Sequence, residues 1–184
     1  MGKEIMLRNV RISFPQLWEE QVKPDGGTYK RGITIVLNPE QNAQQINLVA
    51  KTIVEVAKAE KKFDGVVPKA SKLCIQDGER PEYGPDSKIV KASTAVVPVV
   101  LHKDMTRATP ADDPIYSGCY ANVKIQIWAQ ANQHGRRVNA KLVAIQFAGD
   151  GEAWDAGHIS EEQAVDGFES LEEQGLDDFS DLGI

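Results

Sequence analysis

The sequence predicts a mainly β domain with one long helix, followed by an acidic C-terminal segment. Small or apolar side chains alternate with other residues over 115–130, which is the two-residue repeat of a long strand. Apolar residues recur at helical spacing between residues 39 and 62, and eleven acidic residues without any lysine or arginine occupy residues 151–184. We therefore divide the chain into a folded body, residues 1–150, and a tail, residues 151–184.

The first predicted strand covers residues 4–14, where apolar side chains alternate with polar ones. The alternation slips by one residue at Arg8 and Asn9, which indicates a β-bulge. We expect Arg8 and Arg11 to lie on the exposed side or at the edge of this strand. Pro15 is expected to end its hydrogen-bonded ladder, because proline has no backbone N–H to donate.

Trp18 follows in a loop that is rich in polar residues. A turn at residues 24–27, with the sequence Pro-Asp-Gly-Gly, then leads to the second strand. That strand covers residues 29–37, begins with Tyr29, and carries apolar side chains on one face.

A long helix is predicted from the N-cap Asn38, through Pro39 in its first turn, to about Lys62. Its apolar residues lie on one face, so the helix is expected to pack on the sheet as a lid. They are Ile46, Val49, Ala50, Ile53 and Ala57. The basic residues Lys58, Lys61 and Lys62 suit the negative end of the helix dipole better than a nucleic-acid patch.

Two further short strands are predicted at residues 72–76 and 88–93. The loop between them, residues 77–85, contains two prolines and two glycines, which excludes regular structure there. Tyr83 lies in this loop near Arg80. Either its ring closes over a strand of nucleic acid, or it pins the loop to the body.

A short buried strand over residues 96–101 and a loop over 102–114 lead to a long hairpin. Its first strand covers residues 115–130, a turn follows at 132–135, and the second strand covers 136–147. The apolar residues of the second strand change phase along its length, so we predict a bulge. The first phase contains Val138, Ala140, Leu142 and Ala144, and the second contains Val143, Ile145 and Phe147.

One face of the hairpin combines aromatic rings with basic groups and carries no acidic residue. Rings stack on the bases of single-stranded nucleic acid, and cations meet its phosphates. Aromatic residues also commonly cover sheets, so each ring is either a ligand contact or a packing residue. The candidate nucleic-acid-binding residues are Tyr116, Tyr120, Lys124, Trp128, Arg137, Lys141, Arg8, Arg11, Tyr83, Arg80, Trp18 and Tyr29.

The formal charge of −6 hides a difference between the body and the tail. Residues 1–150 hold the other 16 acidic residues and all 21 basic residues, so the body carries a net charge of +5. The tail is expected to be mostly disordered, although residues 160–163 resemble the capping box of a short helix. Spaced hydrophobic residues among the acids indicate a docking peptide. The candidate partner-binding residues are Asp177, Asp178, Phe179, Asp181, Leu182 and Ile184.

Motifs for catalysis, metals and cofactors are missing from the sequence. It contains no phosphate-binding P-loop, no GxGxxG, no HExxH and no GxSxG. The three histidines are isolated, and Cys74 and Cys119 are expected to be buried thiols in a reducing cytoplasm. No apolar run reaches the length of a membrane helix, about 20 residues, and residues 1–4 do not begin a signal peptide. We therefore predict neither an enzyme nor a metal site, and no cofactor.

Two stretches of the body resemble a known family. Residues 115–123, Ile-Tyr-Ser-Gly-Cys-Tyr-Ala-Asn-Val, and residues 77–81, Asp-Gly-Glu-Arg-Pro, are similar to a group of tailed-bacteriophage proteins. That group was catalogued as a domain of unknown function and later recognised as single-stranded DNA-binding proteins. The resemblance covers most of residues 4–150 and implies an OB-type barrel with an acidic C-terminal tail. The helix follows the second predicted strand rather than the third, so either the barrel is elaborated or a strand has been missed.

The sequence and the resemblance together predict a protein that coats single-stranded DNA during phage replication or recombination, in the cytoplasm of the infected bacterium. The tail is expected to recruit replication or recombination proteins and to compete with DNA for the basic surface. Binding of duplex DNA and formation of homo-oligomers are left open. The alternative is a structural or inhibitory phage protein whose acidic tail mimics DNA, and a nuclease accessory subunit comes third.

Overall fold

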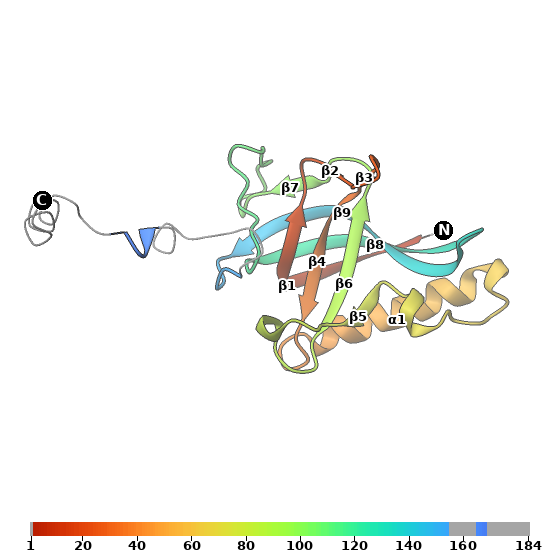
Figure 1. The fold of residues 1–184 in the computed structure, drawn as a ribbon. Helices are drawn as coiled ribbons and strands as arrows, with labels where there is room; N and C mark the ends of the chain where they lie inside the picture. The colour runs from red at the N-terminus through yellow and green to blue at the C-terminus, as the bar shows by residue number, and fades with distance from the viewer. Residues whose placement is uncertain (1, 155–164, 169–184) are drawn as a thin grey trace, which may run out of the picture.

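Five strands close into a barrel in the computed structural model, which describes residues 2–154 and 165–168. They are β1 (Gly2–Gln16), β4 (Arg31–Leu37), β6 (Lys88–Thr94), β8 (Tyr120–Asn132) and β9 (Gly135–Gly149). The sheet order β6-β4-β1-β8-β9 is closed by a parallel pairing of β6 with β9 (Figure 1). This ring of strands has the organisation of an OB-like barrel, so the predicted fold class is confirmed.

Shorter elements decorate the barrel. Strand β5 (Ile75–Asp77) pairs with β6, and β7 (Val99–Leu101) pairs with β9. A separate two-stranded sheet is formed by β2 (Gln21–Val22) and β3 (Thr28–Tyr29). The 3₁₀ helices are η1 (Lys61–Phe63), η2 (Ala70–Lys72) and η3 (Pro81–Tyr83). The predicted strands at 72–76 and 96–101 were therefore placed too early, because η2 and a bend at residues 95–96 occupy their first residues.

Strand β1 contains the predicted bulge. Its pairing with β8 shifts register between Leu7 and Val10, and Asn9 has a φ of 52°. The strand is longer than predicted, because Pro15 does not end it. The pairing with β4 is irregular between Ser13 and Gln16, so Pro15 sits where the ladder is already interrupted.

The hairpin of β8 and β9 was predicted correctly in its alternation and its bulge. Ala121, Val123, Ile125 and Ile127 are fully buried, whereas the residues between them are half-exposed. In β9 the register passes from the pair Lys124–Ala144 to the pair Ile125–Leu142, which leaves Val143 without a partner. The change of phase in the sequence is this bulge.

The start of β8 was predicted five residues too early. Gly118 has a φ of 104° and Cys119 N donates to Tyr116 O at 3.1 Å, so residues 116–119 form a turn. The turn is held against β1, because Gly118 N donates to Ile12 O at 2.7 Å and Ile12 N donates to Cys119 O at 3.0 Å.

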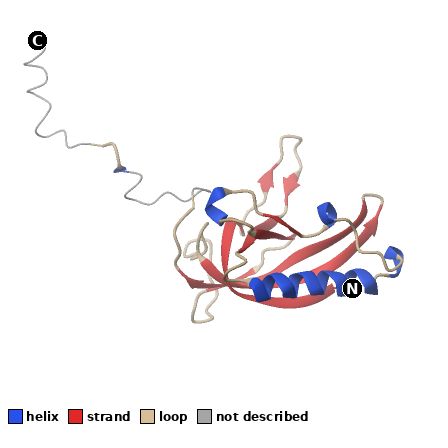
Figure 2. Cartoon of the chain, turned by 90° about the horizontal axis from the view of Figure 1, so that it is seen from below, coloured by secondary structure: helices blue, strands red, loops and turns tan. Residues whose placement is uncertain are grey.

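The helix α1 (Ala43–Ala59) lies across the strands at one end of the barrel (Figure 2). Its buried residues Val49, Ile53, Val56 and Ala57 join the core formed by the inner faces of the strands. It connects β4 to β6, the second and third strands of the ring, and each strand of that ring was predicted. The elaborated barrel is therefore the correct alternative.

The predicted N-cap of α1 was wrong by four residues. Asn38 caps a turn instead, because its Oδ1 accepts from Glu40 N at 2.8 Å. Asn42 is the N-cap, and its Oδ1 accepts from Asn38 N at 3.1 Å. The helix also ends before the predicted Lys62, since η1 follows Glu60.

The chain after β9 packs back on the barrel as a strap, residues 150–154. Trp154 is buried and its backbone N donates to Ser117 O at 3.0 Å. A β-carbon on Gly118 would meet Glu152 O at 2.1 Å, and one on Gly151 would meet Gly118 O at 2.1 Å. Backbone therefore touches backbone here, and neither glycine has room for a side chain.

Most of the tail falls outside the described residues. This applies to the predicted disorder and the capping box at 160–163. It applies equally to the docking residues Asp177, Asp178, Phe179, Asp181, Leu182 and Ile184. Phe168, which is described, is exposed. Among the described residues, no helix is long and apolar enough to span a membrane.

Replacing Gly118 with alanine is expected to lower the free energy of unfolding by about 1–3 kcal/mol, because the new side chain adds a clash to an unfavourable φ. Urea unfolding of the variant measures this loss. Gly135→Ala is the matched control, since Gly135 has a similar φ of 100° but no atom within 4 Å of the new β-carbon. An equal loss in both variants would mean that the strap contact contributes nothing.

Candidate nucleic-acid interface

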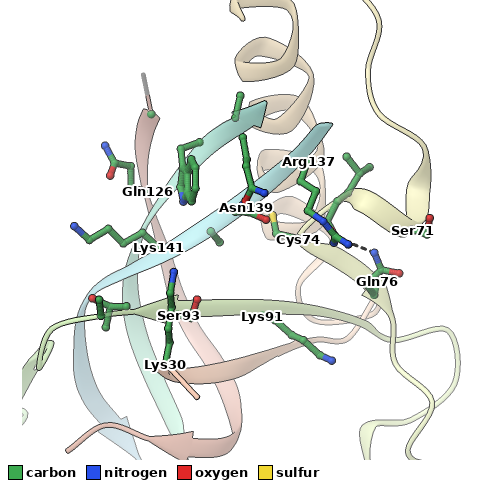
Figure 3. Close-up of a pocket in the computed structure, with 18 residues that line it drawn as sticks. Lys30, Ser71, Cys74, Gln76, Lys91, Ser93, Gln126, Arg137, Asn139 and Lys141 are labelled. Carbon is green, nitrogen blue, oxygen red and sulfur yellow. Dashed lines mark hydrogen bonds between the residues drawn. The ribbon is translucent and has the colours of Figure 1, made fainter. Parts of the chain in front are cut away.

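A groove of about 810 Å³ crosses the outer face of the barrel where β6 meets β9 (Figure 3). The side chains of three strands and their flanking loops line it. Lys141, Asn139 and Arg137 come from β9, and Gln126 and Trp128 come from β8. The other side is formed by Lys91 and Ser93 of β6, with Lys30, Cys74 and Gln76 from neighbouring segments.

The strand period places these side chains outside. Val90 and Ala92 point into the barrel, so Lys91 and Ser93 between and beyond them point outward. The register then aligns the strands, because Ser93 pairs with Lys141 across the barrel closure. Lys141 in turn pairs with Gln126, and Asn139 pairs with Trp128. The groove is thus a continuous row of outward residues over three strands.

The groove is electropositive. Lys30, Lys91, Arg137 and Lys141 line it, and none of its described lining residues is acidic. Within residues 2–154 and 165–168, none of these four cations forms an ion pair. Basic groups that are not neutralised by protein carboxylates are available to an anionic ligand.

Trp128 supplies the ring of this surface. It is half-exposed, and it lies among side-chain amides rather than among apolar residues. Asn139 Nδ2 donates to Gln130 Oε1 at 2.7 Å, which holds two of these amides in place. A flat ring beside cations and amides can stack on a base while the cations bind phosphates.

Other predicted site residues are engaged in the body. Arg11 Nε and Nη2 donate to Gly118 O at 3.1 and 3.0 Å, and Nη2 also donates to Glu152 O at 2.7 Å. Its guanidinium lies 3.9 Å from the ring centre of Trp154 and 5.4 Å from that of Tyr120. Arg11 and Tyr120 thus clamp the strap to the barrel.

Of the two interpretations of Tyr83, the structure favours the one in which it pins the loop. Its side chain is buried, its hydroxyl donates to Ser13 Oγ at 2.8 Å, and its ring packs on Trp154 at 5.2 Å between centroids. A ring buried in this way presents no open face to a base. Arg80 lies over the ring of Phe14 at 4.9 Å instead.

Four more of the predicted residues lie apart from the groove. The Tyr116 hydroxyl donates to Asp150 Oδ1 at 2.8 Å, and Trp18 Nε1 donates to Asp113 Oδ2 at 2.9 Å. Lys124 is half-exposed on β8 beyond Gln126, and Arg8 lines a small hollow beside Tyr120. Tyr29 lies in β3. The structure therefore brings together Trp128, Arg137 and Lys141, and it leaves eight of the other nine outside this groove. The side chain of the ninth, Tyr29, lies outside the described part of the structure.

Burial raises the pKa of both thiols. The pKa of Cys74, at the floor of the groove, is raised to about 11, and that of Cys119 is raised to about 11 as well. Both therefore stay protonated at neutral pH. Burial raises the pKa of the Tyr116 hydroxyl, and its hydrogen bond to Asp150 raises it further. In the described part of the chain, no group of three or more His, Cys, Asp or Glu side chains could hold a metal ion.

Sequence reasoning missed the half of the groove that comes from β6 and the segments near it. Lys30, Lys91 and Ser93 were not among the predicted contacts, and neither was Asn139 of β9. The alternation of residues 88–93 contained the signal for two of them, because Val90 and Ala92 are apolar and their neighbours are polar. Their meeting with β9 could not be predicted, since it depends on how the barrel closes.

Fold and groove together define an OB-like barrel with a basic surface groove. The chain matches, over residues 3–179, the family model described as "Enterobacter phage Enc34, ssDNA-binding protein". The chain therefore belongs to this family of phage proteins.

Individual relatives agree with this assignment. The single-stranded DNA-binding protein from bacteriophage Enc34, solved in complex with ssDNA, is 26% identical, with a TM-score of 0.73 over 82% of this chain and 89% of that chain. "Putative protein p50" of Acyrthosiphon pisum secondary endosymbiont phage 1 is 27% identical over 94% of this chain and 98% of its own. Gp2.5 of bacteriophage T7, a single-stranded DNA-binding protein, covers 86% of this chain and 98% of its own, with a TM-score of 0.59. At 12% identity it shows likeness of fold alone.

Arg11→Ala is expected to lower the free energy of unfolding by about 2 kcal/mol or more, because charged hydrogen bonds of this kind contribute about 1.5–3 kcal/mol. Urea unfolding measures the change. Arg137→Ala is the matched control: it also removes an arginine side chain, but from the groove, and it is expected to leave the free energy of unfolding nearly unchanged. If Arg11→Ala unfolds no more easily than Arg137→Ala, the clamp has no structural role.

Proposed function

We propose that this protein binds single-stranded DNA in the groove and has no enzymatic activity. The observation that supports this most directly is the groove itself, which is lined by Trp128 and four cations. Among the described residues, none of these cations has an ion pair and none of the lining residues is acidic. The Enc34 relative, of the same family and fold, was solved in complex with ssDNA, which supports the same ligand for this chain. We further propose that the protein coats DNA during phage replication or recombination, in the cytoplasm of the infected bacterium.

The binding mode is stacking and charge pairing, without reading of the base sequence. A base stacked on an aromatic ring contributes about 1–3 kcal/mol, and every base has a face that can stack. Lys91 and Lys141 lie on either side of the barrel closure, where they can bind successive phosphates along one strand. A duplex would present its phosphates outward and its bases stacked inside, away from Trp128.

Trp128→Ala is expected to weaken the binding of a single-stranded oligonucleotide by about 1–3 kcal/mol, which is the contribution of one stacked base. Fluorescence anisotropy of a dye-labelled oligonucleotide measures the affinity, and urea unfolding confirms that the fold is kept. Trp18→Ala is the matched control, because Trp18 lies outside the groove. Unchanged affinity of Trp128→Ala would contradict the proposed site.

The groove cations are expected to make binding depend on salt. For single strands the slope of log affinity against log salt is about −0.7 for each phosphate neutralised, so Lys141→Gln should make the slope shallower by about that amount. Titrations at several salt concentrations measure the slope. Lys58→Gln, which removes an exposed charge from α1, should leave it unchanged. Equal slopes in both variants and the wild type would exclude phosphate binding by Lys141.

We also propose that the acidic tail competes with DNA for the groove and recruits replication or recombination proteins. A short flexible tether gives a local concentration in the millimolar range, at which even a weak polyanion competes for the same cations. Because Trp154 belongs to the packed body, the deletion that tests this begins at residue 155.

Deleting residues 155–184 is expected to raise the affinity for DNA at low salt, and to raise it more for duplex than for single strands, because duplex has the higher charge density. Anisotropy titrations of both substrates measure this change. Phe179→Ala in the full chain is the control, since it leaves the tail charge intact and is expected to affect partner docking only. Equal or weaker binding after truncation would rule out the competition.

A further inference from the structure

A second cleft continues from the groove toward the loop at residues 77–85. Gln76 and Lys91 line both hollows, so the groove and this cleft adjoin at these two side chains. Thr34, the register partner of Lys91, lies on its floor, and Phe14 and Arg80 lie at its far end.

Phe14 is held outward by strained backbone. It has a φ of 50°, in the left-handed region that bulky residues avoid, and it stands in the irregular stretch of β1 between Ser13 and Gln16. The residue is 46% exposed and does not belong to the hydrophobic core, so core packing does not explain the strain. Strained backbone that presents a side chain to solvent is a feature of ligand sites.

The charges around Phe14 suit a base better than a phosphate. The Arg80 guanidinium lies 4.9 Å from the centre of the ring, and it is already paired with Glu82. Asp77 and Glu79 also line this end of the cleft, and Asp77 pairs with Lys88. The positive charges of Arg80 and Lys88 are thus neutralised by carboxylates, so they are poorly suited to bind phosphates. The flat surfaces of the Phe14 ring and the Arg80 guanidinium remain available for stacking.

We propose that Phe14, with Arg80 over it, is a second base-stacking site, and that a bound strand runs from Trp128 past Lys91 to Phe14. This inference rests on the proposed function of the groove and extends it. It makes the order of contacts along the DNA explicit: a stack, a run of phosphates across the barrel closure, and a second stack. A strand long enough to reach both rings should therefore bind more tightly than one that fills the groove alone.

The test is a length series of oligothymidines, spanning about 4 to 16 nucleotides, the range of site sizes of OB folds. Wild-type affinity is expected to rise in two steps as each ring is reached. Phe14→Gly should remove the second step, weakening the longer oligonucleotides by about 5- to 150-fold, the equivalent of one lost stack, while the shortest ones bind as before. Phe14→Tyr keeps a ring and should keep both steps.

The thermal stability of the same variant serves as the control for folding. Glycine adopts a φ of 50° without strain, so the thermal midpoint of Phe14→Gly should equal or exceed that of the wild type. If Phe14→Gly keeps both steps while Trp128→Ala weakens every length, the second site is wrong and the groove remains. If neither substitution weakens the binding of an oligonucleotide of any length, both the second site and DNA binding in the groove are wrong.

Discussion

The parallel pairing of β6 with β9 is the contact on which the rest of the structure depends. It consists of two residue pairs, Ala92 with Ala140 and Ser93 with Lys141, yet it converts a curved sheet into a closed ring. It also joins residues that lie almost fifty positions apart in the sequence. Without it, Lys91 and Lys141 would belong to opposite edges of a sheet and the groove would not exist.

This closure requires small residues at the seam. Ala92 and Ala140 are both buried, and a β-carbon on the neighbouring Gly32 would meet Ala92 O at 2.4 Å. Larger side chains would push the strands apart and leave backbone groups without partners. The closure also brings Lys91 and Lys141, which point outward on either side of the seam, to one surface. The packing that closes the barrel thus also shapes the groove.

Local patterns predicted the strands well because their physical cause is local. The two-residue alternation of β8, the slip in β1 and the change of phase in β9 all appear in the structure as expected. The boundaries of elements were predicted less well, because the local sequence there allows two structures. Asn38 and Asn42 are both able to cap a helix, and Gly118 turns a stretch whose alternation is that of a strand.

The candidate site was predictable only on the hairpin. Tyr120 and Trp128 occupy equivalent positions of one alternating face, and the sequence gives no reason to separate them. In the structure Tyr120 lies beneath Arg11, because the strap folds back over that end of β8. Trp128, eight residues further on, is half-exposed and lines the groove. What separates the two rings is a contact with residues 150–154, which no local pattern contains. Likewise, Lys30 and Lys91 join the site only through the barrel closure.

The different surroundings of the three tryptophans have an optical consequence. Trp154 lies 3.9 Å from a guanidinium inside the packed strap, and Trp18 is tied to Asp113 through its indole nitrogen. Trp128 stands in the groove beside cations and amides. Indole emission responds to the polarity and charge around the ring, so each tryptophan reports a different event. Emission from Trp154 is expected to follow the docking of the strap, and DNA bound in the proposed groove is expected to quench Trp128. The chain therefore carries its own spectroscopic probes, with folding and ligand binding separated by position rather than by an added dye.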